Sequence, residues 1–151
     1  MPEHVFTIAA LGHSVDVQTN NLTLFSVIER IVPPQMPCRM PSLSVATLWR
    51  RQPGEEGTVF TQRTRLIDPD GEEIAHLEQS LRASTAQYRV LATLANVPFR
   101  KTGTHRVDVY IRPEDAQDWG AAAASYPIDV AAMQGTDEDS LLPSEENGTT
   151  S

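Results

Sequence analysis

Residues 58–83 read TVFTQRTRLI-DPDG-EEIAHLEQSLRA, two runs of alternating side chains joined by four turn residues. Side chains alternate across a β-strand, so a period near two places one set on a buried face and the other in water. Proline presets φ and glycine accepts positive φ, which makes Asp68-Pro69-Asp70-Gly71 a turn signal. This part of the chain therefore predicts a β-hairpin of residues 58–67 and 72–83.

Similar runs recur along the chain, separated by turn signals. We expect further strands at residues 5–11, 22–32, 42–51, 86–94, 104–112 and 126–130, with the last two paired. Four prolines fall within residues 33–41, where we expect an extended crossing without regular structure. Strands do not alternate with helices, so we predict an all-β fold, an antiparallel immunoglobulin-like β-sandwich of about seven to eight strands.

Two segments leave alternatives open. Residues 22–32 carry apolar side chains on both faces, which indicates a central strand covered on both sides, with a helix as the competing interpretation. The β-branched residues of this segment favour the strand. Residues 113–124 suit a possible short helix that begins at Pro113, or an irregular loop because Gly120 interrupts them.

The length of 151 residues predicts one domain, which we place at residues 1–131. The net charge of −8 is uneven: from Thr136 onward the chain has five acids and no base, which leaves fifteen acids and twelve bases in the body. We expect residues 132–151 to form a disordered acidic tail. The bases form no block, so we expect no nucleic-acid partner.

The expected location is cytoplasmic. The single cysteine, Cys38, excludes an internal disulfide. The first residues carry no basic segment of the kind that opens a signal peptide. No apolar run approaches the ~20 residues of a membrane helix, so we expect no membrane partner.

One run of residues resembles a known family. Asn20-Asn21-Leu22-Thr23-Leu24, followed by Val27-Ile28-Glu29-Arg30-Ile31 and Pro33, is similar to a motif of an uncharacterised family of small bacterial cytosolic proteins. The Asp68-Pro69-Asp70-Gly71 hairpin and the run Gly103-Thr104-His105-Arg106-Val107 look like later segments of the same family. The resemblance covers residues 5–130 and implies an immunoglobulin-like sandwich with no assigned activity. It therefore assigns no functional residue.

This chain departs from the family pattern in two places. Ile28 stands where the family usually has phenylalanine, and residues 113–124 look longer than its usual final hairpin.

The turn at residues 68–73 places four carboxylates within six residues, which is the beginning of a calcium-loop pattern. The rest of the pattern fails, because Gly71 comes too early and Gln79 stands where a bidentate glutamate is needed. We therefore favour a plain turn over a calcium site.

The other candidates for chemistry are weaker. A metal-dependent hydrolase would have to combine His76, His105 and the Asp68 loop, yet no two histidines have a ligand-pair spacing. Cys38 beside Arg39 lacks the signature of a catalytic thiol, and no Gly-x-Ser-x-Gly elbow is present. We accordingly assign no catalytic residue, no metal ligand and no cofactor.

Three residues are candidates for contact with a partner. If the two strands of the hairpin pair, Arg63 and Arg65 share one face and form a row that suits an acidic partner. The same row is compatible with a solvated face that pairs with Glu73 and Glu78, and this is the interpretation that we favour. Trp119 lies in a loop, where tryptophan serves as an anchor for a partner or as a cap on the core, and of these two roles we favour the cap. Trp49 follows the buried alternation and is expected in the core.

Three functions follow from these residues. The first is a non-enzymatic binding or adaptor module that contacts a protein partner through sheet edges or loops. The second is a structural component of an assembly such as a phage virion or a secretion apparatus, and a homo-oligomer is compatible with both. The third is the metal-dependent hydrolase.

Overall fold

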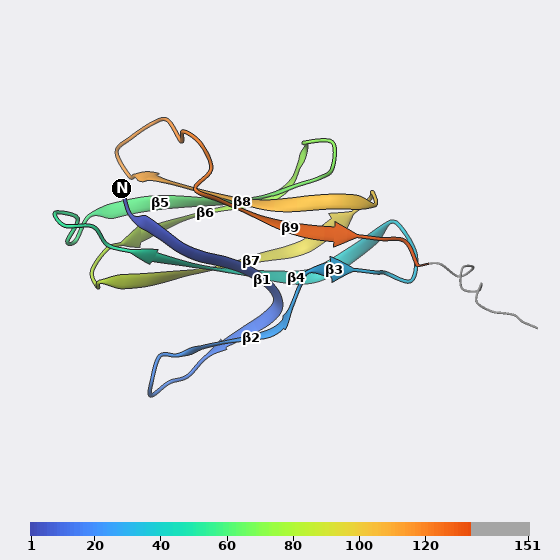
Figure 1. Cartoon of the computed structure of the whole chain (residues 1–151), viewed down its shortest axis with the longest axis horizontal. Helices are drawn as coiled ribbons and strands as arrows, with labels where there is room; N and C mark the ends of the chain where they lie inside the picture. Colours follow the sequence, from blue (N-terminus) through green and yellow to red (C-terminus); the bar gives the residue numbers. More distant parts are fainter. Residues whose placement is uncertain (134–151) are drawn as a thin grey trace, which may run out of the picture.

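The computed structural model describes residues 1–133, in which two sheets pack face to face as a β-sandwich (Figure 1). The strands are β1 (Glu3–Val15), β2 (Leu22–Val27), β3 (Arg30–Ile31), β4 (Cys38–Arg50), β5 (Val59–Ile67), β6 (Glu73–Arg82), β7 (Gln87–Phe99), β8 (Gly103–Pro113) and β9 (Ala124–Val130). Sheet A has the order β2-β1-β4-β7, and sheet B has the order β3-β9-β8-β5-β6. All neighbours are antiparallel except β3 and β9.

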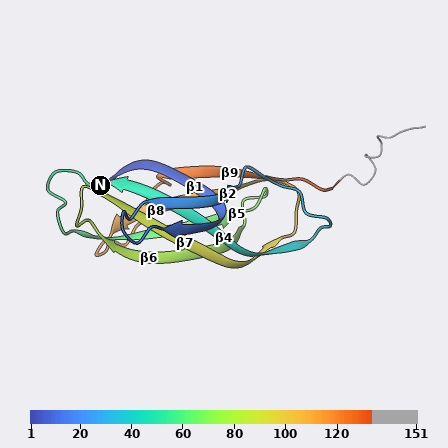
Figure 2. The same ribbon diagram turned by 90° about the horizontal axis from the view of Figure 1, so that it is seen from below.

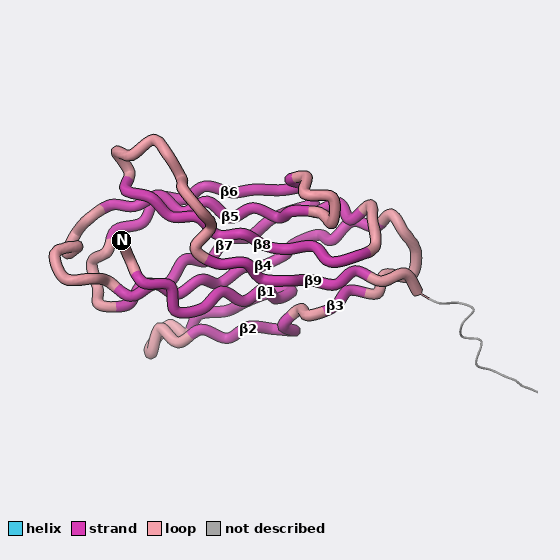
Figure 3. The backbone as a smooth tube through the Cα atoms, turned by 45° about the horizontal axis from the view of Figure 1, so that its top comes forward, coloured by secondary structure: helices cyan, strands magenta, loops and turns pink. Residues whose placement is uncertain are grey.

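The predicted all-β sandwich is confirmed. Strands and loops alone make up residues 1–133 (Figure 3). This part of the chain has no helix that is long and apolar enough to cross a membrane. The predicted acidic tail lies, from residue 134 on, outside the described residues.

The hairpin that decides the fold is formed by β5 and β6, which pair with Arg65 opposite His76. Two backbone hydrogen bonds close its turn: the N–H of Asp68 donates to the carbonyl of Glu72 at 2.8 Å, and the N–H of Gly71 donates to the carbonyl of Asp68 at 3.0 Å. Gly71 has a φ of 90°, which glycine adopts without steric cost. The predicted pairing of the last two strands is confirmed as β8 with β9.

The core lies between the two sheets. Along β4 the alternating residues Leu43, Val45 and Trp49 are fully buried, which confirms Trp49 as a core residue. The indole N–H of Trp49 donates to Oε1 of Gln62 at 2.7 Å. Since a buried polar group is costly without a partner, this bond between β4 and β5 fixes the position of one sheet on the other.

The prediction of one central strand at residues 22–32 is wrong. The segment divides into β2, at the edge of sheet A, and β3, at the edge of sheet B. The backbone turns at Ser26, where φ is 56°, and Ile28 enters the core at 5% exposure. The apolar residues on both faces therefore do not reflect burial on both sides, because Phe25 and Val27 are half exposed.

The proline-rich crossing is shorter than predicted. β4 begins at Cys38 and runs through Pro41, where we expected no regular structure. From Cys38 to Ser42 the strand pairs with β7, whereas its pairing with β1 begins only at Ser44. Proline is tolerated in a strand where one edge needs no N–H donor, and this part of β4 has such an edge.

Residues between Pro113 and Ala124 form a loop, so of the two alternatives for this segment the irregular one is observed. Its backbone reverses at Gly120, which has a φ of 71°. The loop stands over one end of sheet B (Figure 1).

The two long sides of the sandwich end differently (Figures 1 and 2). On the side that we call closed, β6 and β7 lie next to each other, and Nε2 of Gln79 donates to the carbonyl of Leu91 at 3.0 Å. On the side that we call open, the edge strands are β2 and β3. Beyond Ala10, where its pairing with β4 ends, β1 continues with β2 as a two-stranded hairpin that bends away from the rest of the sandwich (Figure 1).

Candidate functional site

The three residues predicted to contact a partner lie together on the outer face of sheet B. On β5 the side chains of Arg63 and Arg65 point outward, because Gln62, Thr64 and Leu66 between and beside them are buried. The neighbouring strand β8 places Tyr110 opposite Arg63. We call the group the arginine–aromatic patch; it consists of Arg63, Arg65, Tyr110, Arg112 and Trp119.

Trp119 reaches this patch from the loop after β8. The guanidinium carbon of Arg112 lies 4.2 Å from the centre of its ring, and that of Arg63 lies 5.9 Å away. The ring of Tyr110 meets it edge to face, with 6.4 Å between the centroids. A cation over an aromatic face is stabilised by ~0.5–1 kcal/mol where it is exposed, so these contacts hold the loop on the sheet. Nη1 of Arg112 also donates to the carbonyl of Ala116 at 2.6 Å.

Carboxylates balance part of the charge of the patch. Nε of Arg65 donates to Oε1 of Glu73 at 2.7 Å, and Nη1 of Arg65 lies 3.3 Å from the hydroxyl of Tyr110. Arg63 lies 3.7 Å from both Glu73 and Glu78. Burial alone would raise the pKa of Glu73, but the hydrogen bond from Arg65 and the nearby charges of His76 and Arg65 lower it. Glu73 is therefore ionised at neutral pH.

The patch thus combines both interpretations of the arginine row. The cross-strand ion pairs with Glu73 and Glu78 are present, as the solvated-face alternative requires. The stacking of Trp119 on two arginines goes beyond a plain solvated face. Sequence reasoning missed Tyr110 and Arg112, because their place beside Arg63 depends on the pairing of β5 with β8 across more than forty residues.

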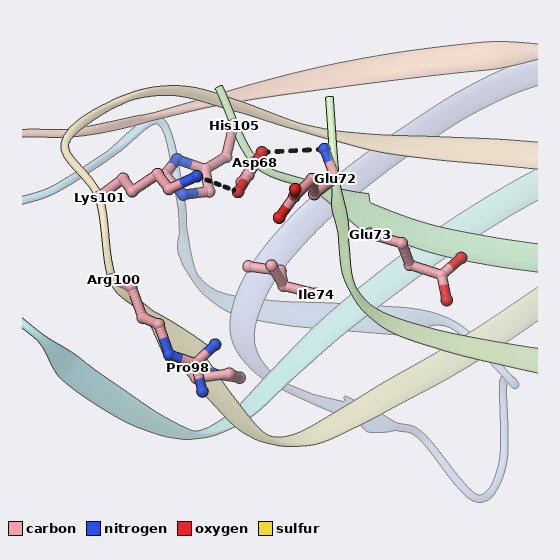
Figure 4. Close-up of a pocket in the computed structure, with 8 residues that line it drawn as sticks. All are labelled: Asp68, Glu72, Glu73, Ile74, Pro98, Arg100, Lys101 and His105. Atoms are coloured by element: carbon pink, nitrogen blue, oxygen red, sulfur yellow. Dashed lines mark hydrogen bonds and ion pairs between the residues drawn. The ribbon is translucent and has the colours of Figure 1, made fainter. Parts of the chain in front are cut away.

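A second feature, a pocket of about 310 Å³, lies at the end of the closed side (Figure 4). Its lining comes from the two turns that join β5 to β6 and β7 to β8 and from the strands beside them. The lining residues are Asp68, Glu72, Glu73, Ile74, Pro98, Arg100, Lys101 and His105.

Asp68 holds the β5–β6 turn together at this pocket. Its Oδ1 accepts from the backbone N–H groups of Asp70 and Glu72, each at 2.9 Å, and its Oδ2 accepts from Nζ of Lys101 at 3.1 Å. The hydrogen bond from the Glu72 N–H and that from Lys101 lower the pKa of Asp68. Because these donors occupy the carboxylate, Asp68 acts as a cap for the turn.

His105 is fully buried beside Asp68 and Lys101 (Figure 4). Its Nδ1 lies 3.2 Å from the carbonyl of Gly103, and its ring packs edge to face on Phe99 at 5.2 Å. Burial lowers the pKa of this imidazole, so it is neutral at pH 7. The hydrogen bond at Nδ1 places the proton there and leaves Nε2, which has no partner within residues 1–133, as an acceptor.

Of the parts proposed for a hydrolase, the structure brings His105 beside Asp68 but leaves His76 apart from them. His76 is exposed and contacts Glu73 at 2.8 Å, whereas His105 is buried in the pocket. In the part of the chain that the structure describes, no three His, Cys, Asp or Glu side chains are placed to hold one metal ion. Cys38 packs half-buried against the core at the start of β4.

Comparison with solved structures finds distant similarity. A glycosyl hydrolase family 2 member from Bacteroides cellulosilyticus is 12% identical, with a TM-score of 0.45 over 60% of this chain and 12% of that chain. A β-glucuronidase of glycoside hydrolase family 2 is 14% identical, with a TM-score of 0.45 over 69% of this chain and 13% of that chain. The chain thus spans about an eighth of the length of these enzymes.

An immunoglobulin-like protein from Pseudomonas aeruginosa is 14% identical, with a TM-score of 0.36 over 87% of this chain and 97% of that chain. No curated protein matches the sequence. A family model described as "Family of unknown function (DUF6941)" matches residues 7–120.

Proposed function

Starting from the chain's membership of the family of unknown function DUF6941, we propose that it is a non-enzymatic binding module. It recognises a protein partner through its loops and sheet surfaces, and the arginine–aromatic patch is the contact surface. The proposal includes a bacterial source and a cytoplasmic location.

The observation that carries the proposal is the position of Trp119. A loop side chain lies on two arginines from neighbouring strands, yet it is only half-buried. Tryptophan, tyrosine and arginine are the residue types enriched in the energetic centres of protein interfaces, and this patch contains all three. The contacts among them orient the side chains before a partner arrives, which lowers the entropy cost of binding.

The ion pairs of the patch define the chemistry of the partner. Glu73 and Glu78 neutralise part of the charge of Arg63 and Arg65, so the patch does not attract anions in general. It offers the edges of planar guanidinium groups and the face of an indole ring. A protein surface with one or two carboxylates beside an apolar side chain fits such a patch, because guanidinium groups bind carboxylates through parallel hydrogen bonds.

Quantitative affinity capture from a bacterial lysate tests the proposal. Immobilised wild-type protein is compared with Trp119→Ala and Arg63→Ala, and mass spectrometry measures each captured protein. The matched control is Arg30→Ala, which removes the same charge from an exposed residue of β3 on the open side. Thermal unfolding verifies that each variant folds.

We expect one set of proteins to bind the wild type and the control and to lose at least about tenfold in affinity with either patch variant, as for a hot-spot residue. Captured proteins that are the same for all four baits would contradict the proposal. So would an effect of Trp119→Ala on stability alone, because the tryptophan would then serve only to hold its loop.

A further inference from the structure

The pocket at the end of the closed side contains a buried polar atom without a partner. His105 is fully buried, and its Nε2 has no hydrogen-bond partner in residues 1–133. The bond from Nδ1 to the carbonyl of Gly103 makes Nε2 an acceptor. A buried acceptor without a donor is costly, so a donor comes from the chain, from water or from a ligand. Because His105 lines the pocket, a molecule that enters the pocket can supply this donor (Figure 4).

The ammonium group beside His105 also has a hydrogen bond left to make. Lys101 carries three hydrogens on Nζ and donates to Oδ2 of Asp68 at 3.1 Å and to Oδ2 of Asp70 at 2.5 Å. One hydrogen therefore remains for a further acceptor. Burial lowers the pKa of His105, and the charge of Lys101 adds to this effect, so the two groups are close enough to interact. The wall of the pocket thus presents one acceptor and one donor next to each other.

The rest of the lining offers polar groups on two sides and an apolar surface between them. Glu72 comes from the β5–β6 turn and Arg100 from the β7–β8 turn (Figure 4). Within residues 1–133 neither side chain forms an ion pair. Ile74 and Pro98 contribute the apolar surface. The carboxylate and the guanidinium group are therefore available to a bound molecule.

The charges around the pocket favour a neutral ligand. Three acids and two bases line it: Asp68, Glu72, Glu73, Arg100 and Lys101. A carboxylate ligand would bring no hydrogen to Nε2 of His105, and an ammonium ligand would come next to the ammonium group of Lys101. A hydroxyl group both donates and accepts. It can donate to Nε2 of His105 and accept the remaining hydrogen of Lys101 at the same time.

We infer that the pocket binds a small neutral compound with neighbouring hydroxyl groups, of the class of sugars and polyols. One hydroxyl donates to Nε2 of His105. Further hydroxyls reach Glu72 and Arg100, because a carboxylate accepts from a hydroxyl and a guanidinium group donates to it. The C–H groups of the ligand lie on Ile74 and Pro98. The volume of about 310 Å³ is at the lower end of the ~300–1,000 Å³ of small-molecule sites, which limits the ligand to about one sugar ring.

This inference does not rest on the proposed function, because the pocket shares only Glu73 with the surroundings of the arginine–aromatic patch. A titration with small molecules alone keeps the two apart. The full chain, labelled with ¹⁵N, is titrated with glucose, galactose and mannose, and with sorbitol as an open-chain polyol. Alanine and acetate serve as charged compounds of small size. NMR records the backbone amides and the imidazole nitrogens.

We expect at least one of the neutral compounds to shift the amides of the two turns and Nε2 of His105 in a saturable way. Alanine and acetate should leave these resonances unchanged at the same concentration. A preference for the sugars over sorbitol assigns a ring as the ligand, and the reverse preference assigns an open chain.

Variants of His105 test the acceptor itself. His105→Phe keeps a ring at the same place but removes Nε2, so it should weaken binding at least about tenfold. His105→Gln, whose amide oxygen is an acceptor, should keep more of the affinity than His105→Phe. The matched control is His13→Phe, the same substitution on β1, which should bind like the wild type.

Should His105→Phe fail to fold by circular dichroism, Arg100→Ala replaces it, with the same expected loss of affinity. Three results would each overturn the inference. The first is the absence of saturable shifts with every neutral compound, since water alone would then satisfy Nε2. The second is an equal response to alanine or acetate. The third is an unchanged affinity in the folded variant that lacks His105 or Arg100.

Discussion

The closed and open sides of the sandwich differ in whether the edge strand of sheet A is covered. At the closed side β7 carries fully buried apolar residues up to Phe99, and β6 lies alongside it. At the open side β2 has an equally apolar sequence, but Phe25 is exposed because nothing in residues 1–133 covers it. An apolar strand therefore indicates burial only when a neighbour is present.

The largest effect is expected from one phenylalanine on each side. Phe99→Ala removes a fully buried ring from β7 and should lower the free energy of unfolding by ~3–5 kcal/mol. Phe25→Ala removes a ring that is 52% exposed and should change the stability of the monomer by less than ~0.5–1 kcal/mol. Urea denaturation at low protein concentration measures both. Equal losses would show that the open side is part of the monomer core.

A second pair concerns glycines. Gly103 has a φ of 121°, and a Cβ there would lie 3.0 Å from Cγ of Pro69 in the neighbouring turn. Gly103→Ala should therefore lower the free energy of unfolding by ~1–3 kcal/mol. Gly12→Ala on β1 meets nothing closer than 3.9 Å and should be tolerated or slightly stabilising. Thermal unfolding of the two variants checks the difference, and a larger loss at Gly12 would contradict it.

A third pair concerns the aspartates that hold the turn on each side. The Glu72 N–H and Lys101 lower the pKa of Asp68, and hydrogen bonds from Thr19 lower the pKa of Asp16. A carboxyl group whose pKa is lower in the folded than in the unfolded protein stabilises the fold. This stabilisation is complete at pH values above the ordinary pKa of 3.8 and is lost as the pH falls through the lowered pKa. Asp68→Asn should reduce the difference in stability between neutral and acid pH more than Asp16→Asn, because Asp68 is buried. Urea midpoints from pH 7 down to pH 2 give the comparison; a larger change for Asp16→Asn would reverse it.

The smallest effects are expected at two tyrosines. The hydroxyl of Tyr88 on β7 is buried without a partner in the described residues, so Tyr88→Phe should be neutral or stabilise by up to ~1 kcal/mol. The hydroxyl of Tyr126 donates to the carbonyl of Ile28 at 2.5 Å, so Tyr126→Phe should cost ~1 kcal/mol.

Burial also raises the pKa of Tyr88 to about 12. The folded protein therefore loses stability as the pH rises from the ordinary value of 10.0 towards 12, and Tyr88→Phe should remove this loss. Ultraviolet titration of the tyrosines measures the pKa, and a value for Tyr88 near 10 would contradict its burial.

Sequence reasoning succeeded where the signal is local. Neighbouring residues alone determine the turn at residues 68–71 and the alternation along β8. The sequence therefore predicted the β5–β6 hairpin and the pairing of β8 with β9. The break between β2 and β3 did not, because the positive φ is at Ser26, a residue that gives no signal of it. The end of β7 was missed for a similar reason: Asn96 has a φ of 52°, yet the strand continues to Phe99.

The candidate site was predicted in part. Arg63 and Arg65 share a face because of alternation alone, which the sequence shows directly. Trp119 could be named as a loop aromatic, but its contact with Arg112 requires the reversal of the chain after β8. The pocket beside His105 brings together two turns that are more than thirty residues apart, and no local pattern encodes such proximity.

Ile28 links the two layers at the open side. Its backbone N–H donates to the carbonyl of Ala9 in sheet A at 2.8 Å, its carbonyl accepts from Tyr126 of sheet B, and its side chain is buried between them. Although it belongs to no strand, its amide should exchange with deuterium as slowly as those of the central strands, because both layers must separate before solvent reaches it. Local opening of the β1–β2 hairpin should therefore stop before Ile28.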